Sequence, residues 1–255
     1  LRRWKELIDN IRSPEREITV AMCGKYTKLV DSYASIVESF HHCAAHLRCR
    51  INLEWVETTD LKDTSFLNGV DGVIVPGGFG HRGTEGKIEV IRGARERNIP
   101  FLGLCLGLQL AVIEFGRNVC GLSNANSTEM DPDTPHPVID ILPEQKMISE
   151  KGGTMRLGAY PAVLKQGSVV HALYRATEVS ERHRHRYEVN PEYHRVIQER
   201  GMVFSGISRD GRLVEFIELP EHRFFVATQA HPELKSRMDV PAPLFYGFVK
   251  ACMNE

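Results

Sequence analysis

The 255-residue sequence lacks an excess of charge of either sign. It contains 32 lysine and arginine residues and 33 aspartate and glutamate residues, so its formal net charge is −1 at pH 7. Domains that bind nucleic acids or anionic membrane surfaces normally carry a clear basic excess. We therefore expect no nucleic-acid partner and no membrane partner, and the charge balance alone identifies no ligand.

Long hydrophobic runs are also absent from the sequence. The longest, 101–113, already contains Gln109 and is followed by Glu114, so it is well short of the roughly 20 apolar residues that a membrane-spanning helix needs. Charged residues at positions 2, 3, 5 and 6 exclude an apolar signal-peptide core there. The 42% hydrophobic and 25% charged residues are typical of a globular protein rather than a disordered one.

Cysteine is sparse, with six residues and no C-x-x-C pair. This number is too small for a disulfide framework in a chain of this length. His183 and His185 lie two residues apart without a third ligand nearby, which is a poor pattern for zinc. We therefore expect free thiols, a cytoplasmic location and no metal site.

The first position holds Leu1 rather than methionine. Residues 1–12 predict a short amphipathic helix, because the apolar positions 1, 4, 7, 8 and 11 share one face and Ser13-Pro14 ends the pattern. We expect a linker helix over 1–15 and one large domain over 16–255. We also expect the chain to be part of a longer protein.

From residue 16 onward, apolar strand patterns alternate with helical patterns. Strands are predicted over 18–23, 51–56, 70–75 and 100–104, and helices over 31–48, in the sixties, over 84–97 and over 106–117. This alternation predicts an α/β fold with a mostly parallel central sheet flanked by helices on both faces. Ligands of such sheets bind at the carboxyl ends of the strands.

The second half of the chain has a different pattern. Short apolar runs over 138–142, 203–208, 213–219 and 224–229 are separated by Gly, Asp and Pro. They predict additional short antiparallel strands in the same domain. The run 243–253 predicts a closing helix.

A candidate nucleophile lies where a predicted buried strand meets a helix, in Gly103-Leu104-Cys105-Leu106-Gly107. This is a nucleophile-elbow pattern with cysteine in place of serine, and its sharp turn needs small neighbours. At the helix start, backbone N–H groups and the helix dipole stabilise a thiolate, and the N–H of Leu106 becomes an oxyanion-hole donor. The pentapeptide alone fits a buried core cysteine equally well.

A candidate base follows the predicted strand 224–229, in His231-Pro232-Glu233. In an extended segment the side chains of His231 and Glu233 project to the same side, so the carboxylate can fix the imidazole tautomer. A thiolate nucleophile in acyl transfer needs such a base and orienting group. The H-P-E tripeptide is weak alone and becomes specific beside the cysteine elbow.

A glycine-rich segment, Pro76-Gly77-Gly78-Phe79-Gly80, follows the predicted strand 70–75, and 78–83 also satisfies G-x-G-x-x-G. A dinucleotide site would need an acidic residue about 20 positions further on, at the end of the next strand. That strand ends at Cys105 instead. We favour a nest of backbone N–H groups that faces the cysteine and completes the oxyanion hole.

The densest charge cluster is 181–188, with sequence ERHRHRYE. On a strand, its arginines share one face and its histidines the other. A solvated edge strand and a nucleic-acid patch are alternatives, and the neutral chain weakens the second. We favour an arginine fork directed at a substrate carboxylate.

These motifs together resemble a known family. PGGFG (76–80), GLCLGLQ (103–109) and HPE (231–233), in this order, resemble a class I glutamine amidotransferase domain. NANSTE (124–129), GGTMRLG (152–158) and RHRHRYEVN (182–190) more narrowly resemble the glutaminase half of the CTP synthase family. The resemblance covers nearly the whole chain from about residue 16.

The resemblance implies roles for particular residues. Cys105 would form a γ-glutamyl thioester, His231 would act as base and acid, and Glu233 would orient it. Gly78 and Leu106 would supply the oxyanion-hole N–H groups. The implied glutamine-binding residues are Gln109, Glu129 for the α-ammonium group, Arg186 for the α-carboxylate, Phe79 and Tyr187.

It also implies partners and cofactors. These are L-glutamine, a synthase domain of the same polypeptide and GTP at the interface, where Arg82, Gly83 and Glu85 belong to a stretch resembling the family's lid. Glutamine hydrolysis needs no cofactor, whereas the full-length enzyme is expected to use ATP and Mg with GTP as activator. Ala230 and Leu234 flank HPE where family members usually carry aromatics, so we expect different packing behind the histidine.

Three alternatives remain open. The chain could be another class I amidotransferase subunit, a γ-glutamyl hydrolase on the same scaffold, or a catalytically silent regulatory domain. The motifs at 124–129, 152–158 and 182–190 favour the CTP synthase family over the first two. The intact Cys105, His231 and Glu233 argue against the third.

Overall fold

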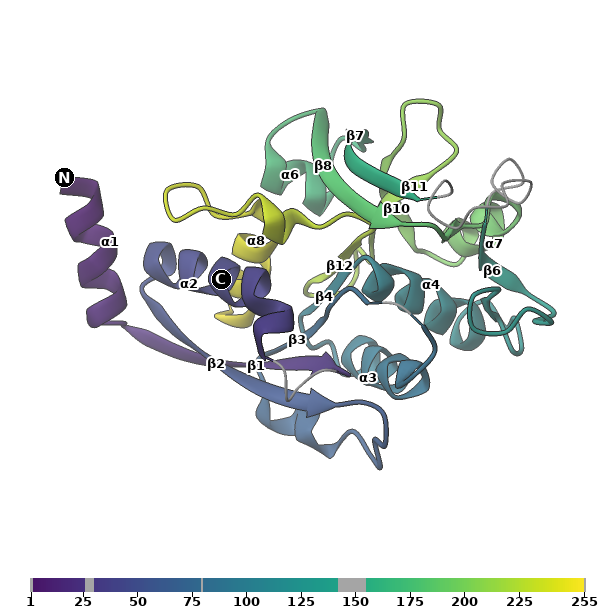
Figure 1. The fold of residues 1–255 in the computed structure, drawn as a ribbon, viewed down its shortest axis with the longest axis horizontal. Coiled ribbons are helices and arrows are strands. Elements are labelled where there is room, and N and C mark those ends of the chain that lie inside the picture. The colour runs from purple at the N-terminus through teal and green to yellow at the C-terminus, as the bar shows by residue number, and fades with distance from the viewer. Residues whose placement is uncertain (1, 26–29, 79, 142–154, 255) are drawn as a thin grey trace.

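The computed structural model describes residues 2–25, 30–78, 80–141 and 155–254, which are arranged around a nine-stranded mixed sheet (Figure 1). The parallel strands are β1 (Arg16–Gly24), β2 (Cys49–Glu57), β3 (Gly72–Val75), β4 (Phe101–Leu104) and β12 (Phe225–Thr228). The antiparallel strands are β7 (Arg156–Leu164), β8 (Glu178–His185), β10 (Val203–Ile207) and β11 (Val214–Glu218). The strand order β2-β1-β3-β4-β12-β11-β10-β7-β8 confirms the predicted α/β class.

The central parallel strands β3, β4 and β12 are almost entirely apolar, with Thr228 as the exception, because helices cover both of their faces. Every residue of β3, β4 and β12 is buried. β8, the edge strand of the sheet, instead alternates, with His183 and His185 buried and Arg182 and Arg184 exposed. The predicted separation of histidines and arginines along 181–186 is therefore confirmed for the residues that lie in the strand.

One strand differs from the prediction for the second half. β12 is antiparallel to β11 but parallel to β4, with Ala227 opposite Gly103. The run 224–229 is therefore the last strand of the parallel core as well as the first neighbour of the antiparallel strands. Its position brings the segment after β12 beside the segment after β4, where Cys105 lies.

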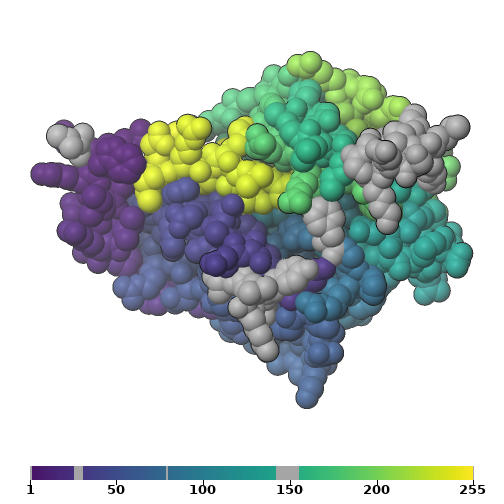
Figure 2. All heavy atoms as spheres, viewed as in Figure 1, coloured from purple at the N-terminus to yellow at the C-terminus, as the bar shows by residue number. Residues whose placement is uncertain are grey.

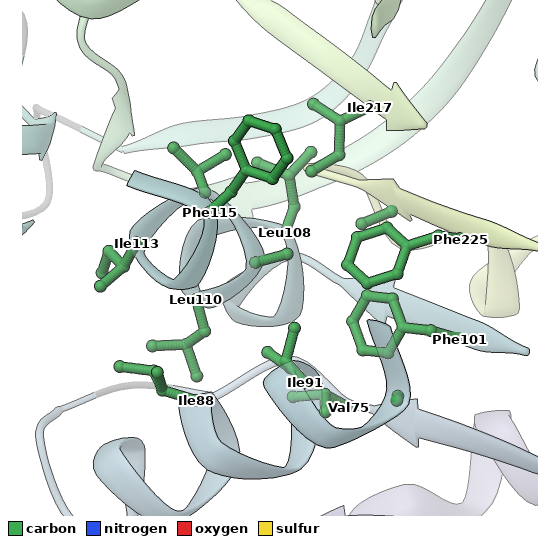
Figure 3. Packing of buried hydrophobic residues seen from close by; sticks show 14 of the residues in the cluster. Val75, Ile88, Ile91, Phe101, Leu108, Leu110, Ile113, Phe115, Ile217 and Phe225 are labelled. Carbon is green, nitrogen blue, oxygen red and sulfur yellow. The ribbon is translucent and has the colours of Figure 1, made fainter. Parts of the chain in front are cut away.

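Helices pack on both sheet faces. α3 (Thr84–Glu96) and α4 (Leu106–Asn118) cover one face, and α2 (Ala34–Leu47) and α8 (Pro243–Cys252) belong to the hydrophobic cluster on the other. On the first face, Ile91 and Leu108 pack around the Phe101 and Phe225 rings, whose centroids are 4.5 Å apart (Figure 3). β4 and β12 thus lie between two packed helical layers.

The amino-terminal helix α1 (Arg2–Arg12) forms as predicted. Figure 2 shows it at one end of the molecule, beside the carboxyl-terminal segment drawn in yellow, and the Arg3 guanidinium donates to the Asp239 carbonyl group. Leu7 is buried, whereas Trp4, Ile8 and Ile11 are about half exposed. Much of the apolar face of α1 is thus open to solvent in this chain.

The remaining elements are short. They are η1 (Val30–Tyr33), η2 (Ser65–Gly69), β5 (Asn126–Ser127), β6 (Pro137–Asp140), α6 (Val169–Tyr174), β9 (Glu188–Val189), η4 (Pro191–Tyr193), α7 (His194–Glu199) and η5 (Pro232–Leu234). Residues 138–140 of the predicted run 138–142 lie in β6, in the separate three-stranded sheet β5-β6-β9, and residue 142 is outside the described residues. Within the described ranges, no helix combines the length and apolarity needed to cross a membrane.

Candidate active site

Cys105 lies in the sharp turn between β4 and α4. Its φ of 50° and ψ of −99° are outside the regions that most side chains adopt. A Cβ atom on Gly103 would lie 2.8 Å from the Ala227 Cβ atom, and one on Gly107 would collide with the Val75 carbonyl oxygen. Glycine is therefore required on both sides of the turn, as the elbow pattern predicts.

His231 and Glu233 lie beside Cys105 because β12 is paired with β4. The His231 Nδ1 atom is 2.7 Å from the Glu233 Oε1 atom, and the imidazole is also hydrogen-bonded to Cys105. The His231 backbone N–H donates to the Arg182 carbonyl oxygen at 2.8 Å, which ties this segment to β8. Cys105, His231 and Glu233 thus form a contiguous triad.

The backbone of the HPE segment differs from the prediction of an extended chain. Pro232–Leu234 form a 3₁₀ turn, closed by a hydrogen bond from the Leu234 N–H to the His231 carbonyl oxygen. Proline favours the first position of a helical turn because its φ is fixed there and its missing N–H is not needed. Leu234 is 52% exposed while Ala230 is buried, so no large side chain occupies either flanking position.

The triad stabilises a charged imidazole. Burial by itself lowers the pKa of His231, but hydrogen bonds to Cys105 and Glu233 and the negative charges of those groups raise it to about 10. His231 is therefore an imidazolium at neutral pH. Such a cation is the partner that activates a cysteine nucleophile.

Two cavities meet at Cys105. The smaller, of about 60 Å³, is lined by Gly78, Cys105, Gln109, Glu129, Met155, His185, Arg186 and Tyr187. The larger, of about 260 Å³, is lined by Ser32, Tyr33, Ser35, Ile36, Pro76, Gly77, Gly78, Cys105, Arg184, His231, Glu233 and Leu234. The smaller cavity thus combines four of the five predicted glutamine-binding residues.

The smaller cavity has a charge of each sign on its wall. Glu129 is held by the glycine segment, since the Gly80 N–H donates to its Oε1 atom at 3.2 Å. Arg186 lies beyond the end of β8 and lines the same cavity. A carboxylate and a guanidinium in one small cavity suit an α-amino acid, which carries an ammonium and a carboxylate group.

The three arginines of the cluster do not act as one fork. Arg186 lines the smaller cavity and Arg184 the larger one, while Arg182 lines neither. The reason is the strand itself, because Arg182 and Arg184 share its exposed face and Arg186 follows its last residue.

The other predicted site residues lie elsewhere or outside the described part of the chain. Phe79 and residues 152–154 of the GGTMRLG motif are outside the described residues. Gly83 precedes α3 with φ of +73°, Arg82 donates to the Lys25 carbonyl oxygen at 2.9 Å, and Glu85 pairs with Arg117 at 2.7 Å. None of these three is among the residues that line the two cavities at Cys105.

The sequence patterns missed two residues at the nucleophile. Gln229, fully buried, places its Nε2 atom 3.7 Å from the Cys105 sulfur. A Cβ atom on Gly77 would lie 2.8 Å from the His231 ring, so this glycine makes room for the base. A buried glutamine directly after the apolar run 224–228 is the signal that could have identified Gln229.

A buried polar cluster behind the site was also missed. Arg156 bridges Glu188 at 3.0 Å and Glu215 at 2.9 Å. Beside it, His183 Nδ1 and His185 Nε2 are 3.0 Å apart. Burial and Arg156 lower the pKa of His183 to about 3, and burial lowers the pKa of His185 well below its usual range, so both are neutral.

The described residues contain no group of three or more His, Cys, Asp and Glu side chains that could hold a metal ion. The cysteines of this part of the chain are all free thiols, and burial raises the pKa of Cys23, Cys43 and Cys252. Among the free cysteines, only Cys105 is hydrogen-bonded to a triad histidine.

Comparisons with known proteins agree with this geometry. The sequence matches the family described as glutamine amidotransferase class-I over residues 28–251. It is 53% identical to proteins named CTP synthase from Methanococcus maripaludis and from Caldanaerobacter subterraneus subsp. tengcongensis, covering 100% of this chain but 49% and 48% of theirs. The chain therefore spans about half the length of these curated relatives.

A solved structure described as "Trypanosoma brucei CTPS - glutaminase domain with bound acivicin" has the same fold. Its TM-score to this chain is 0.86, with 37% identity over 93% of this chain and 94% of that one. The chain belongs to the class I glutamine amidotransferases and, within them, to the glutaminase domains of CTP synthases.

Proposed function

We propose that this chain hydrolyses L-glutamine to glutamate and ammonia through a thioester on Cys105. The observation that carries the proposal is the contiguous triad of Cys105, His231 and Glu233, which opens onto a cavity walled by Glu129 and Arg186. The bound acivicin named for the Trypanosoma brucei domain also supports an amino-acid site in this family.

In the first half of the reaction, the Cys105 thiolate attacks the carboxamide carbon of glutamine. The oxyanion that forms accepts hydrogen bonds from the backbone N–H groups of Gly78 and Leu106. Leu106 is the first residue of α4, and such an N–H has no acceptor within its helix. As the C–N bond breaks, imidazolium His231 gives its proton to the departing nitrogen, so ammonia leaves and a γ-glutamyl thioester remains.

In the second half, water cleaves the thioester. Neutral His231 takes a proton from the water as its oxygen attacks the thioester carbon, and the oxyanion again forms in the same hole. Its collapse breaks the C–S bond, which releases glutamate and restores the thiolate and the imidazolium. Glu233 keeps the ring oriented throughout through its 2.7 Å contact with Nδ1.

We assign substrate recognition to the smaller cavity. Glu129 would hold the α-ammonium group and Arg186 the α-carboxylate, while Gln109, Tyr187 and Phe79 complete the binding set. The opposite charges of Glu129 and Arg186 in one cavity support this assignment.

For the whole protein, we propose that the ammonia aminates UTP to CTP in a synthase domain, with ATP and Mg, in the cytoplasm. Residues 1–15 would be the linker to that domain, and the half-exposed apolar face of α1 supports this proposal. GTP would act at the interface near Arg82, Gly83 and Glu85. Their position supports this proposal, because they lie at the start of α3, shortly after the glycine segment near Cys105.

The test is ammonia release from glutamine, with and without the synthase domain and GTP, together with mass spectrometry after incubation with acivicin. We expect release that Cys105→Ala abolishes, and an acivicin adduct on the peptide that contains Cys105. Isolated, the chain should be slow, because a lid tuned by a partner is not closed. A chain with neither an adduct nor hydrolysis, even with the synthase domain and GTP, would be a silent regulatory domain. Hydrolysis of γ-glutamyl peptides in preference to glutamine would favour the γ-glutamyl hydrolase.

A further inference from the structure

We infer that Gln229 is a further catalytic residue, whose side-chain amide donates a hydrogen bond to the Cys105 sulfur. We also infer that Gln109 and the Tyr187 carbonyl group fix the direction of this donor. The inference rests on the proposed function only in taking Cys105 as the nucleophile.

The strand pairing places Gln229 at the sulfur. The Cys105 backbone N–H donates to the Thr228 carbonyl oxygen at 2.7 Å, so the residues that follow β4 and β12 remain neighbours. The Gln229 N–H in turn donates to the Glu215 carbonyl oxygen at 2.9 Å, which holds its backbone on the side of β11. Gln229 is fully buried, and its Nε2 atom is 3.7 Å from the sulfur.

The surrounding hydrogen bonds determine which end of the Gln229 amide faces the sulfur. A backbone carbonyl can only accept, so Gln109 must present its NH₂ group to the Tyr187 oxygen, at 3.1 Å. The same Gln109 nitrogen lies 3.3 Å from Gln229 Oε1. A flipped Gln229 would place two NH₂ groups against each other and its oxygen against the sulfur. The NH₂ group of Gln229 therefore faces Cys105.

A second donor fixes the direction of the Tyr187 carbonyl group, with which this series of hydrogen bonds begins. His185 Nδ1 lies 3.1 Å from that oxygen, so in the neutral ring Nδ1 carries the proton and Nε2 is an acceptor. His183 Nδ1 then donates to His185 Nε2 across 3.0 Å. The neutral histidine pair thus orients the carbonyl group that orients Gln109, and Gln109 orients Gln229.

The donor has a chemical use in both halves of the reaction. A hydrogen bond to a charged acceptor is stronger than one to a neutral acceptor. The Gln229 N–H therefore favours the thiolate over the thioester sulfur, which stabilises the resting nucleophile and its departure when water cleaves the thioester. Because Gln109 is also in the proposed glutamine-binding set, the same contact connects the substrate cavity to the nucleophile.

Other titratable and charged groups also face the sulfur, and they are unchanged by a substitution at position 229. From the elements packed around it, they are His231, Glu233, Arg184, His185, Arg186 and Glu129. A difference between variants at position 229 therefore reports the loss of the Gln229 donor.

The test is the rate at which iodoacetamide alkylates Cys105, followed by intact mass from about pH 5 to 9, where thiolate fractions change. In this reaction the sulfur forms a bond to the CH₂ carbon and iodide leaves, so no glutamine recognition is needed. Gln229→Met removes the donor at similar length, and Gln229→Leu removes it with a shorter apolar side chain. The matched control is Gln198→Met, on the exposed surface of α7.

At the acidic end of the range we expect about tenfold slower alkylation for Gln229→Met and a similar loss for Gln229→Leu, as for one hydrogen bond to a charged group. Gln198→Met should match the unmodified chain. If a folded Gln229→Met or Gln229→Leu variant keeps the original pH profile, the inference is wrong; one folded variant is enough to decide. Failure of the unmodified chain to take up acivicin would instead count against the proposed function.

Discussion

Two histidines of this molecule each lie near a glutamate, yet the mostly buried His231 is a cation and the fully buried His183 is neutral. His231 is 2.7 Å from Glu233 and its pKa is raised to about 10, whereas His183 is 3.7 Å from Glu215 and its pKa is lowered to about 3. Burial acts in the same direction on both, since it disfavours the imidazolium. The difference lies in the other charges of each cluster.

At His231, the Cys105 sulfur and the Glu233 carboxylate both favour a cation and together outweigh burial. At His183, Arg156 already occupies both Glu188 and Glu215, so its positive charge adds to burial. A glutamate beside a histidine therefore does not by itself make a charged pair. The cation that the glutamate already contacts decides whether the histidine is an imidazolium or a neutral hydrogen-bonding ring.

Replacing the charged histidine should give the largest effect. We expect His231→Ala to lower the rate of glutamine hydrolysis by about 10³-fold, because it removes both the proton donor and the cation beside the thiolate. Ammonia release with the synthase domain and GTP present measures this loss. A variant with more than about a tenth of the original rate would show that another group moves the proton.

Removing Arg156, the cation beside the neutral His183 and His185, should lower the free energy of unfolding more than it lowers the rate of glutamine hydrolysis. In Arg156→Met, Glu188 and Glu215 lose the guanidinium that pairs with them, and breaking such a buried pair costs about 3 kcal/mol or more of unfolding free energy. Urea unfolding at neutral pH measures it. The control is Arg195→Ala, which breaks an exposed pair with Glu199 and should leave the curve unchanged. Equal curves for both variants would contradict a buried network.

Weakening the triad at its carboxylate should give a smaller loss of activity. Glu233→Gln removes a charge that raises the pKa of His231, so that pKa should fall and hydrolysis should slow by about tenfold to a hundredfold. The pH profile of ammonia release distinguishes this variant from a misfolded one, since its alkaline limb should move to lower pH. An unmoved limb would mean that Glu233 does not charge the ring.

A further difference should appear in the pH dependence of stability. The pKa of His183 is lowered from 6.5 to about 3 on folding. Between these two pH values the unfolded chain binds a proton at His183 that the folded protein does not bind. The free energy of unfolding is therefore unaffected by His183 above pH 6.5 and decreases as the pH falls toward 3. The loss should reach about 1.4 kcal/mol per pH unit in that window. Unfolding of His183→Asn, measured against the original chain, should show a shallower decline. Parallel declines would mean that His183 is already protonated in the folded protein.

The parts of this fold that could be predicted from sequence are those with a local signal. The alternating strands and helices of the first half, the elbow at Cys105 and the HPE segment all have patterns within a few residues. The parallel pairing of β12 with β4 could not be predicted in this way, because a run of four buried residues does not specify its neighbour. α6 and α7, six residues each, are too short to show a helical period.

The same distinction applies to the site. Gln109, Glu129 and Arg186 were predicted from motifs, and the structure places them in one cavity with Cys105. Gln229 and the Arg156 cluster depend on contacts between residues far apart in the chain. The Gln229 contact follows from strand order, and the pairing of Arg156 with Glu215 joins residues 59 positions apart. No pattern within a few residues contains that information.

The measurement that most directly tests this account is ¹⁵N NMR of the histidine rings at neutral pH, in the original chain and in Cys105→Ala. We predict that His231 carries protons on both ring nitrogens, that removal of the sulfur lowers its pKa, and that His183 and His185 each carry one proton, on Nδ1. A neutral His231 in the original chain, or a charged His183 or His185, would contradict it.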